Sequence, residues 1–329
     1  MQAILAITVP FFALVLCGYL AAQREVLPEA AIPGLNTFVL FFALPCLLFR
    51  FGSSLPVSQL VDPALLGVYG VCAIVMVAFS VGMTVRLTHG ASGVDLKDAA
   101  FGALVAAFPN TGFMGVPLLV ALFGERAVGP AISTILVDLF LTSSLCIALA
   151  QMHAHAAAES SMARAVWLSM RAALGNPLPW AIGLGGLFSF AGWALPGPLA
   201  VLVKMLGDAA TPVALFTIGA VMWRAGRHAH TRTPAAQFVP VALFKLLVHP
   251  LLVLGVGLLA HAAGVAVPAF GLTVLVLVAA LPSASNVSLL AERYGADNGR
   301  VARIIMTSTV LALLSFSVFA WALGAQPKL

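Results

Sequence analysis

The chain has 329 residues, of which 62% are hydrophobic and 8% are charged, and its mean hydropathy is +1.09. A soluble domain carries about 25% charged and about 45–50% apolar residues, so this composition excludes a water-soluble globular enzyme. Apolar runs of roughly 20 residues, the length that crosses a ~30 Å hydrocarbon core, recur along the chain. The sequence therefore predicts an all-α polytopic membrane protein with short loops.

Ten transmembrane helices are predicted from the apolar runs and from the charged or Pro/Gly breaks between them. Five lie in the first half, at 3–22, 33–51, 64–87, 97–123 and 126–152. Five lie in the second half, at 165–192, 197–224, 236–262, 267–293 and 300–324. A polar stretch separates the halves, so the predicted units are a first repeat at 1–152, a connecting loop at 153–164 and a second repeat at 165–329.

The net charge of +5 is explained by topology rather than by nucleic-acid binding. Cytoplasmic loops of membrane proteins carry an excess of Lys and Arg. One predicted side has eleven, namely Arg24, Arg86, Lys97, Arg164, Arg171, Arg224, Arg227, Arg232, Arg293, Arg300 and Arg303. The other has four, namely Arg50, Arg126, Lys204 and Lys328. We expect a bacterial inner-membrane protein with the connecting loop in the cytoplasm and both termini in the periplasm.

The two halves share the positions of several helix-breaking and small residues. The pairs Pro10/Pro177, Gly18/Gly185 and Pro45/Pro212 are each 167 residues apart, and Pro109/Pro282 are 173 apart. An odd number of helices in each unit places the second unit upside down relative to the first. Inverted repeats of this kind are a transporter architecture, with the binding site near the bilayer midplane.

The fourth and ninth segments each contain a proline and small polar residues in mid-span, in Phe108-Pro109-Asn110-Thr111-Gly112 and in Leu281-Pro282-Ser283-Ala284-Ser285-Asn286. Proline removes a backbone donor and clashes with the preceding turn, so both helices are predicted to break there. The N–H groups freed at a helix start attract anions. The predicted substrate-binding residues at the two breaks are Pro109, Asn110, Thr111, Pro282, Ser283, Ser285 and Asn286. Ordinary proline kinks are the alternative.

Amide side chains add to this predicted site. A neutral amide donates to a carboxylate without the cost of burying a charge. Asn110 follows the first break, Asn286 follows the second, and Asn176 precedes Pro177 at the start of the sixth segment. Asn176 is predicted to bind substrate, and the alternative is that it only caps its helix.

Ionisable residues inside membrane segments are costly and usually functional. Asp138 and Asp208 are candidates for binding a coupled H⁺ or Na⁺, and the alternative for Asp138 is a structural pair with Lys245. Lys245 either faces the anion as a substrate-binding residue or neutralises an Asp. His249 follows Lys245 by one helical turn and is expected to be a core histidine.

The sequence carries no motif of an enzyme. The four cysteines lie in apolar segments without C-x-x-C spacing, which predicts neither a metal site nor disulfides. There is no nucleophile–base arrangement, no H-E-x-x-H and no nucleotide motif. We therefore expect no enzymatic activity, no ATP-driven transport and no cofactor other than Na⁺ or H⁺ as coupling ion.

Several of these motifs resemble the auxin efflux carrier family, which includes plant auxin exporters and bacterial permeases for malonate, malate and related acids. Pro109-Asn110-Thr111 with Met114-Gly115-Val116-Pro117 resembles the family's fourth, crossover helix. Ala280-Leu281-Pro282 and Ala291-Glu292-Arg293-Tyr294 resemble its ninth. The resemblance extends over nearly the whole chain through Phe42-Ala43-Leu44-Pro45, Gly175-Asn176-Pro177, Asp208-Ala209 and Phe216-Thr217-Ile218-Gly219.

The resemblance implies ten helices in two inverted repeats, two proline crossovers that meet at the site, and contacts from Asn110 and Asn176 to a substrate carboxylate. The short connecting loop resembles the compact bacterial permeases. Two features depart from the plant proteins: Asp138 stands where they carry a neutral polar residue, and 283–286 differs from their second crossover.

We therefore expect a secondary transporter of a small organic anion, most favourably a dicarboxylate such as malonate, coupled to H⁺ or Na⁺. The alternative is an exporter or uniporter of a monocarboxylic weak acid. The expected partners are that anion and the lipid bilayer, with no nucleic acid. The oligomeric state stays open, a homodimer included.

Overall fold

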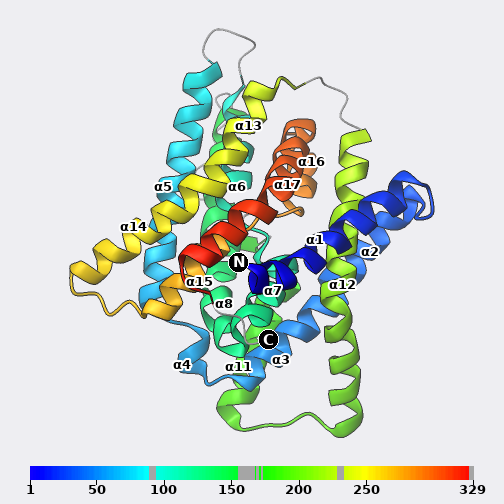
Figure 1. Ribbon diagram of the computed structural model, residues 1–329, viewed down its shortest axis with the longest axis vertical. Helices are drawn as coiled ribbons and strands as arrows, with labels where there is room; N and C mark the ends of the chain where they lie inside the picture. The colour runs from blue at the N-terminus through cyan, green and yellow to red at the C-terminus, as the bar shows by residue number, and fades with distance from the viewer. Residues whose placement is uncertain (89–93, 155–166, 168–169, 172, 228–232, 326–329) are drawn as a thin grey trace.

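The computed structural model describes residues 1–88, 94–154, 167, 170–171, 173–227 and 233–325 (Figure 1). Within these ranges the fold is all-helical, and the only extended pairing is one isolated bridge between two chain segments. The predicted connecting loop 153–164 lies almost wholly outside the described residues, as do Arg164, Arg232 and Lys328.

The described part of the first half contains nine α-helices: α1 (Gln2–Gln23), α2 (Ile32–Phe38), α3 (Leu44–Ser54), α4 (Val57–Leu60), α5 (Pro63–Thr88), α6 (Leu96–Ala107), α7 (Val116–Phe123), α8 (Val128–Val137) and α9 (Ser143–Ala154). The described part of the second half contains α11 (Pro177–Ala191), α12 (Gly197–Arg227), α13 (Ala235–Leu243), α14 (His249–Ala262), α15 (Ala269–Ala279), α16 (Val287–Arg293) and α17 (Asn298–Ala322).

Seven helical stretches are long and apolar enough to cross a membrane, at 2–23, 29–54, 57–86, 125–151, 197–227, 235–262 and 298–322. Three shorter apolar helices lie at 111–123, 177–191 and 269–279, within the predicted fourth, sixth and ninth segments. The multi-pass, all-helical class is therefore confirmed for the described residues. The number of ten crossings stays a prediction.

Several long helices contain one wide, π-helical turn where a proline follows. The turns Val39–Ala43, Thr111–Gly115 and Phe244–Val248 each end two residues before a proline, at Pro45, Pro117 and Pro250. A proline has no N–H to donate and its ring collides with the carbonyl one turn back. The wider turn relieves that collision without ending the helix, and such turns are frequent at functional sites.

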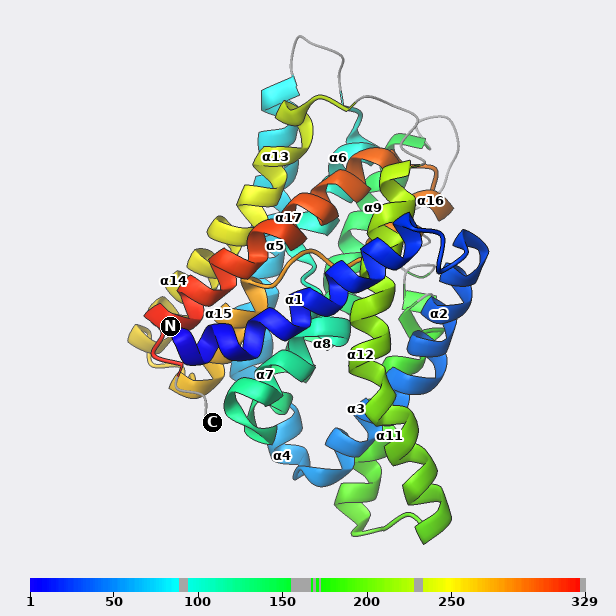
Figure 2. The same ribbon diagram turned by 45° about the vertical axis from the view of Figure 1, so that its right-hand side comes forward.

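The helices form two groups that pack against each other (Figure 2). In the first, which we call the α12 group, α12 packs on α1, α2 and α3, and α11 packs on α3. In the second, which we call the α15 group, α5 packs on α6 and α14, α6 on α9, α14 on α15, and α13 and α16 on α17. The groups meet where α17 contacts α1 and α12.

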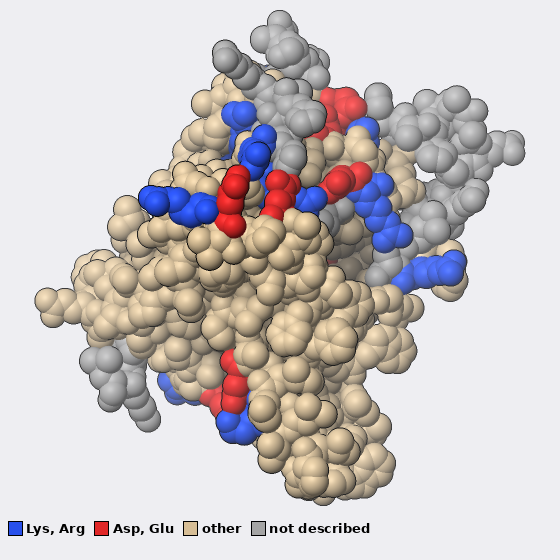
Figure 3. All heavy atoms as spheres, turned by 90° about the vertical axis from the view of Figure 1, so that its right-hand side faces the viewer, with Lys and Arg blue, Asp and Glu red and all other residues tan. Residues whose placement is uncertain are grey.

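Charged side chains are absent from a broad belt around the face shown in Figure 3. They gather in a larger band near one end of the molecule and a smaller band near the other. The belt between them consists of uncharged residues on this face, as a lipid-facing surface requires.

Glycines allow very close approach between helices of the α12 group. Gly18 of α1 lies against the backbone of Phe216 in α12, and Gly219 of α12 lies against the backbone of α1. In the same way Gly185 of α11 lies against Gly52 and the backbone of α3. Gly185 follows Gly18 by 167 positions, as Gly219 follows Gly52, so the two contacts use the same spacing as the predicted repeat.

Replacing Gly185 by Ala should destabilise the protein, because the added Cβ would lie 2.5 Å from the carbonyl oxygen of Phe49. An overpacked contact of this kind costs about 1–3 kcal/mol. The matched control is Gly183→Ala in the same helix, where a Cβ meets nothing within 4 Å. We expect a lower thermal midpoint in detergent for Gly185→Ala only. Equal midpoints would mean that α11 and α3 do not approach this closely.

Candidate functional site: two paired helix breaks

The predicted breaks in the fourth and ninth segments are present. α6 ends at Ala107, Phe108 is extended, and the helix resumes at Thr111. α15 ends at Ala279, and α16 begins only at Val287. Both interruptions lie at the proline of each segment, whose nitrogen carries no hydrogen to donate to the preceding turn.

The two breaks pair with each other through the backbone. The N–H of Asn110 donates to the carbonyl of Pro282 at 2.9 Å, and the N–H of Ala284 donates to the carbonyl of Phe108 at 3.0 Å. Pro109 and Ser283 thereby face one another in an isolated antiparallel bridge. Non-helical backbone at membrane depth requires such internal partners, because lipid offers none.

Further hydrogen bonds fix the chain on both sides of the bridge. The carbonyl of Asn110 accepts from the N–H groups of Met114, at 3.1 Å, and Gly115, at 2.9 Å, which starts the helix after the first break. At the second break, the Ser308 hydroxyl oxygen in α17 accepts from the N–H of Ser283 at 3.2 Å. The bridge is therefore anchored to α17 as well as to its own two helices.

A small pocket of about 30 Å³ lies against the paired breaks. It has room for about one water molecule. Among the predicted site residues its wall contains Pro109, Asn110, Thr111, Asn176 and Asn286. The structure thus brings together three asparagines from three separate parts of the sequence.

The pocket holds several hydrogen-bonding groups without partners. The Asn110 side chain is 4% exposed and makes no side-chain hydrogen bond with the described part of the chain. The Thr111 hydroxyl is buried and has no partner there either. The N–H groups of Gly112 and Phe113, in the first turn after the break, have no acceptor among the described residues. Asn176 uses its carbonyl oxygen to cap α11, accepting from the Leu178 N–H at 2.9 Å, so its NH₂ group stays available.

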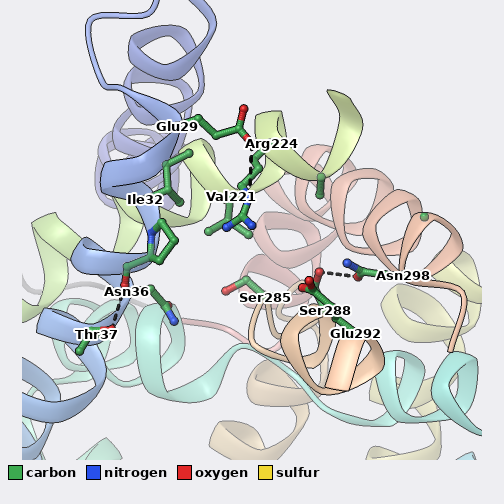
Figure 4. A pocket seen from close by; sticks show the side chains of 13 residues that line it. Glu29, Ile32, Asn36, Thr37, Val221, Arg224, Ser285, Ser288, Glu292 and Asn298 are labelled. Atoms are coloured by element: carbon green, nitrogen blue, oxygen red, sulfur yellow. Dashed lines mark hydrogen bonds and ion pairs between the residues drawn. The ribbon is translucent and has the colours of Figure 1, made fainter. Parts of the chain in front are cut away.

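A larger cavity of about 560 Å³ lies on the other side of the second break (Figure 4). Its wall includes Glu29, Asn36 and Arg224 of the α12 group, and Ser285, Ser288, Glu292 and Asn298 from the second break, α16 and α17. Glu29 and Arg224 form an ion pair of 3.5 Å, and the Ser288 hydroxyl donates to Asn298 at 2.6 Å. Ser285 lines this cavity while its neighbours Ala284 and Asn286 line the small pocket, so the second break separates the two.

A second polar cluster is buried within the α15 group. One Asp138 oxygen accepts from the Tyr69 hydroxyl at 3.2 Å and the other from Thr142 at 2.9 Å. Lys245 donates to the Ala279 carbonyl, the last of α15, at 2.8 Å and lies 3.1 Å from Nδ1 of His249. The Tyr69 and His249 rings are 5.8 Å apart, which joins the two halves of the cluster. All these side chains are fully buried.

Comparisons with known proteins agree with this architecture. Residues 3–320 match the family described as "Membrane transport protein". A Rhizobium meliloti (strain 1021) protein named "Putative malonate transporter" is 29% identical to this chain, and the match covers 99% of this chain and 98% of the relative. Uncharacterized transporters of Methanothermobacter thermautotrophicus (strain Delta H) and Escherichia coli (strain K12) are 28% and 24% identical, covering 93% and 96% of this chain and 94% and 93% of the relatives.

The chain belongs to the membrane transport protein family, the auxin efflux carrier family. The resemblance stated from the sequence motifs is therefore confirmed. Membership makes the chain a multi-pass membrane transporter and not an enzyme.

In this membrane transport protein Lys245 does not line the pocket that the breaks form. Its ammonium group stabilises the carbonyl end of α15, where the helix dipole is negative. His249, expected to be a core histidine, is fully buried and lies one turn after Lys245, with its Nδ1 3.1 Å from the Lys245 ammonium nitrogen. Pro282, Ser283 and Ser285 also lie outside the pocket wall, although Pro282 and Ser283 form the bridge behind it.

Asp208, a candidate for the coupled ion inside a membrane segment, is not buried, because its side chain is 48% exposed. It forms ion pairs with Arg50 at 2.7 Å and Lys204 at 2.5 Å. Arg50 thus links α3 and α12. The sequence could not reveal this pair, because the partners are 158 residues apart.

Sequence reasoning missed Tyr69 and the ion pair of the large cavity. Tyr69 is one of only three tyrosines and lies within an apolar segment, which is a usable signal for a buried hydrogen bond. Glu29 and Arg224 carry no comparable signal, because a charge at the end of a segment is normally solvated.

Replacing Asp208 by Asn should leave transport intact. Exposed ion pairs contribute little, because water already solvates the separated charges. We expect substrate uptake into proteoliposomes, normalised to protein amount, to match the unmodified protein. Loss of uptake with an unchanged thermal midpoint would contradict this reading and return Asp208 to the ion-coupling role.

Proposed function

We propose that the protein is a secondary active transporter of a small organic anion, most favourably a dicarboxylate such as malonate. The observation that carries the proposal is the meeting of Asn110, Asn176 and Asn286 at two paired helix breaks. Amide groups and free helix N–H groups are suited to bind a carboxylate. The name of the Rhizobium meliloti relative supports malonate as the first substrate to test.

We also propose that ten crossings form two inverted repeats, at 1–152 and 165–329, joined by the loop 153–164. The reciprocal packing of α1 on α12 and of α11 on α3 supports this, because each repeat then places its first helix on the second helix of the other. The bridge between the breaks supports it in the same way, since Pro109 and Pro282 occupy matching positions.

The proposed location is the inner membrane of a bacterium, with both termini in the periplasm. The eleven cationic residues of one predicted side support this orientation against four on the other. The large cavity, with Arg224 and Glu292 in its wall, then opens toward the cytoplasm.

Transport is proposed to proceed by alternating access around the paired breaks. The cavity of about 560 Å³ and the pocket of about 30 Å³ lie on opposite sides of the second break. A movement of the α15 group against the α12 group changes both volumes, because residues of the α12 group line both: Glu29 and Arg224 the cavity, Leu40 and Asn176 the pocket.

Coupling to H⁺ or Na⁺ is proposed to use Asp138 rather than Asp208. Asp138 is fully buried, whereas Asp208 is already engaged by two exposed cations. The cluster around Asp138 also reaches the second break, because Lys245 holds the carbonyl of Ala279 where α15 ends. A change in the charge of this cluster therefore acts on the helix end beside the site.

The alternative function is export or uniport of a monocarboxylic weak acid by the same fold. The pocket wall favours it in one respect, since no cationic side chain among the described residues lines it. Counterflow experiments distinguish the two functions, because they measure whether the protein exchanges monocarboxylates or dicarboxylates across the membrane.

Replacing Asn110 by Ala should abolish saturable malonate uptake into proteoliposomes without lowering membrane abundance. The change removes a buried donor from the pocket and leaves the bridge, which uses the Asn110 backbone. The matched control is Asn36→Ala in the wall of the large cavity, which should retain saturable uptake. Normal uptake by Asn110→Ala would show that the Asn110 side chain does not bind the substrate.

Replacing Asp138 by Asn should remove the stimulation of uptake by one imposed ion gradient, either H⁺ or Na⁺. The amide keeps the size of the side chain but carries no charge. Its single oxygen can accept from one of the two hydroxyls of Tyr69 and Thr142, and its NH₂ group can donate to the oxygen of the other. Each gradient is imposed separately on labelled malonate uptake. A variant that responds to both gradients like the unmodified protein would leave Asp138 with a structural role only.

A further inference from the structure

We propose that the pocket carries its anion as a monoanion, with one carboxylate bound and any second carboxyl group protonated. This inference rests on the proposed function and specifies the charge state of the transported substrate. It rests on the polar groups of the pocket, on the charges around it and on the charges of the large cavity.

The unpartnered polar groups of the pocket gather at one break. The Asn110 side chain, the Thr111 hydroxyl and the N–H groups of Gly112 and Phe113 come from four consecutive residues after Pro109. Asn176 adds one NH₂ group from the start of α11. These donors are sufficient for the two oxygens of one carboxylate, each of which accepts about two hydrogen bonds.

The rest of the wall offers little to a second carboxylate. It consists mainly of apolar side chains, namely Leu40, Phe108, Phe113, Ile135, Leu139, Leu178 and Ala284. The remaining polar side chain, Asn286, is a neutral amide. An ionised carboxylate placed against such a wall loses its hydration without gaining a charged partner, whereas a protonated carboxyl group does not carry that penalty.

The nearby buried cation does not serve the pocket. Lys245 is fully buried and holds the Ala279 carbonyl and His249. The buried acid of the same cluster, Asp138, accepts from Tyr69 and Thr142. These two groups carry opposite formal charges, so the cluster supplies no net positive charge for a dianion.

The large cavity also disfavours a dianion. Its described wall carries one cation, Arg224, and two acids, Glu29 and Glu292, for a formal charge of −1. Arg224 is already paired with Glu29 at 3.5 Å. A substrate that passes through this cavity is repelled by its net negative charge. The repulsion energy of a monoanion is half that of a dianion at the same distance.

The test compares malonate with malonamate, whose single carboxylate and neutral amide fix its charge at −1. Uptake of each labelled compound into proteoliposomes is measured from mildly acidic to neutral pH with no imposed gradient. Protonation of the protein affects both substrates, so it cancels when the apparent KM of malonate is divided by that of malonamate. The ratio then reports only the charge of malonate. We expect this malonate-to-malonamate ratio to rise about tenfold per pH unit above the second ionisation of malonate, because the fraction of monoanion falls tenfold.

A ratio that stays constant or falls with rising pH would overturn the inference, since it would mean that the dianion is accepted. Arg224 is the cation in the described wall of the large cavity, and it could hold a second carboxylate. The Arg224→Gln variant tests whether it does. We expect this variant to leave the malonate-to-malonamate ratio unchanged, and a selective loss of malonate would also overturn the inference. If neither compound is taken up saturably, the proposed function itself fails, which is a separate result.

Discussion

Two backbone hydrogen bonds, between Asn110 and Pro282 and between Ala284 and Phe108, are the contact on which the rest of the site depends. Each broken helix alone would leave peptide groups unsatisfied in the membrane interior, at a cost of several kcal/mol for each group. Where the two breaks lie side by side, the peptide groups of each form hydrogen bonds with those of the other. Neither interruption is therefore stable without the other, although they lie in different halves of the chain.

The helices around the bridge are shaped by the same requirement. All residues from Ala99 to Ala107 in α6 and from Val274 to Ala279 in α15 are buried, so these two stretches are apolar on every side. α6 packs against α5, α9 and α17, and α15 packs against α14 and α8. The glycine contacts of α1 with α12 and of α11 with α3 keep the α12 group narrow, which lets its helices approach the bridge closely.

Much of this arrangement follows from the sequence. Apolar runs gave the class and most helix bounds, and Pro109 and Pro282 gave the two breaks, because both signals are local. The pocket asparagines were predicted from their positions beside prolines. The partners of the charged residues were not predicted: Asp208 pairs with Arg50 across α3 and α12, and Lys245 donates to a backbone carbonyl. The roles of both residues in transport stay predictions. Which partner neutralises a charge depends on contacts between distant segments, and a single sequence does not contain them.

The volume of the large cavity has a consequence for how the helix groups move. At about 30 Å³ for each molecule in the liquid, a cavity of about 560 Å³ has room for on the order of twenty waters. Any state in which the α12 and α15 groups close over this side must return those waters to the bulk. The equilibrium between the open and closed states therefore depends on water activity, and osmolytes too large to enter the cavity shift it toward closure.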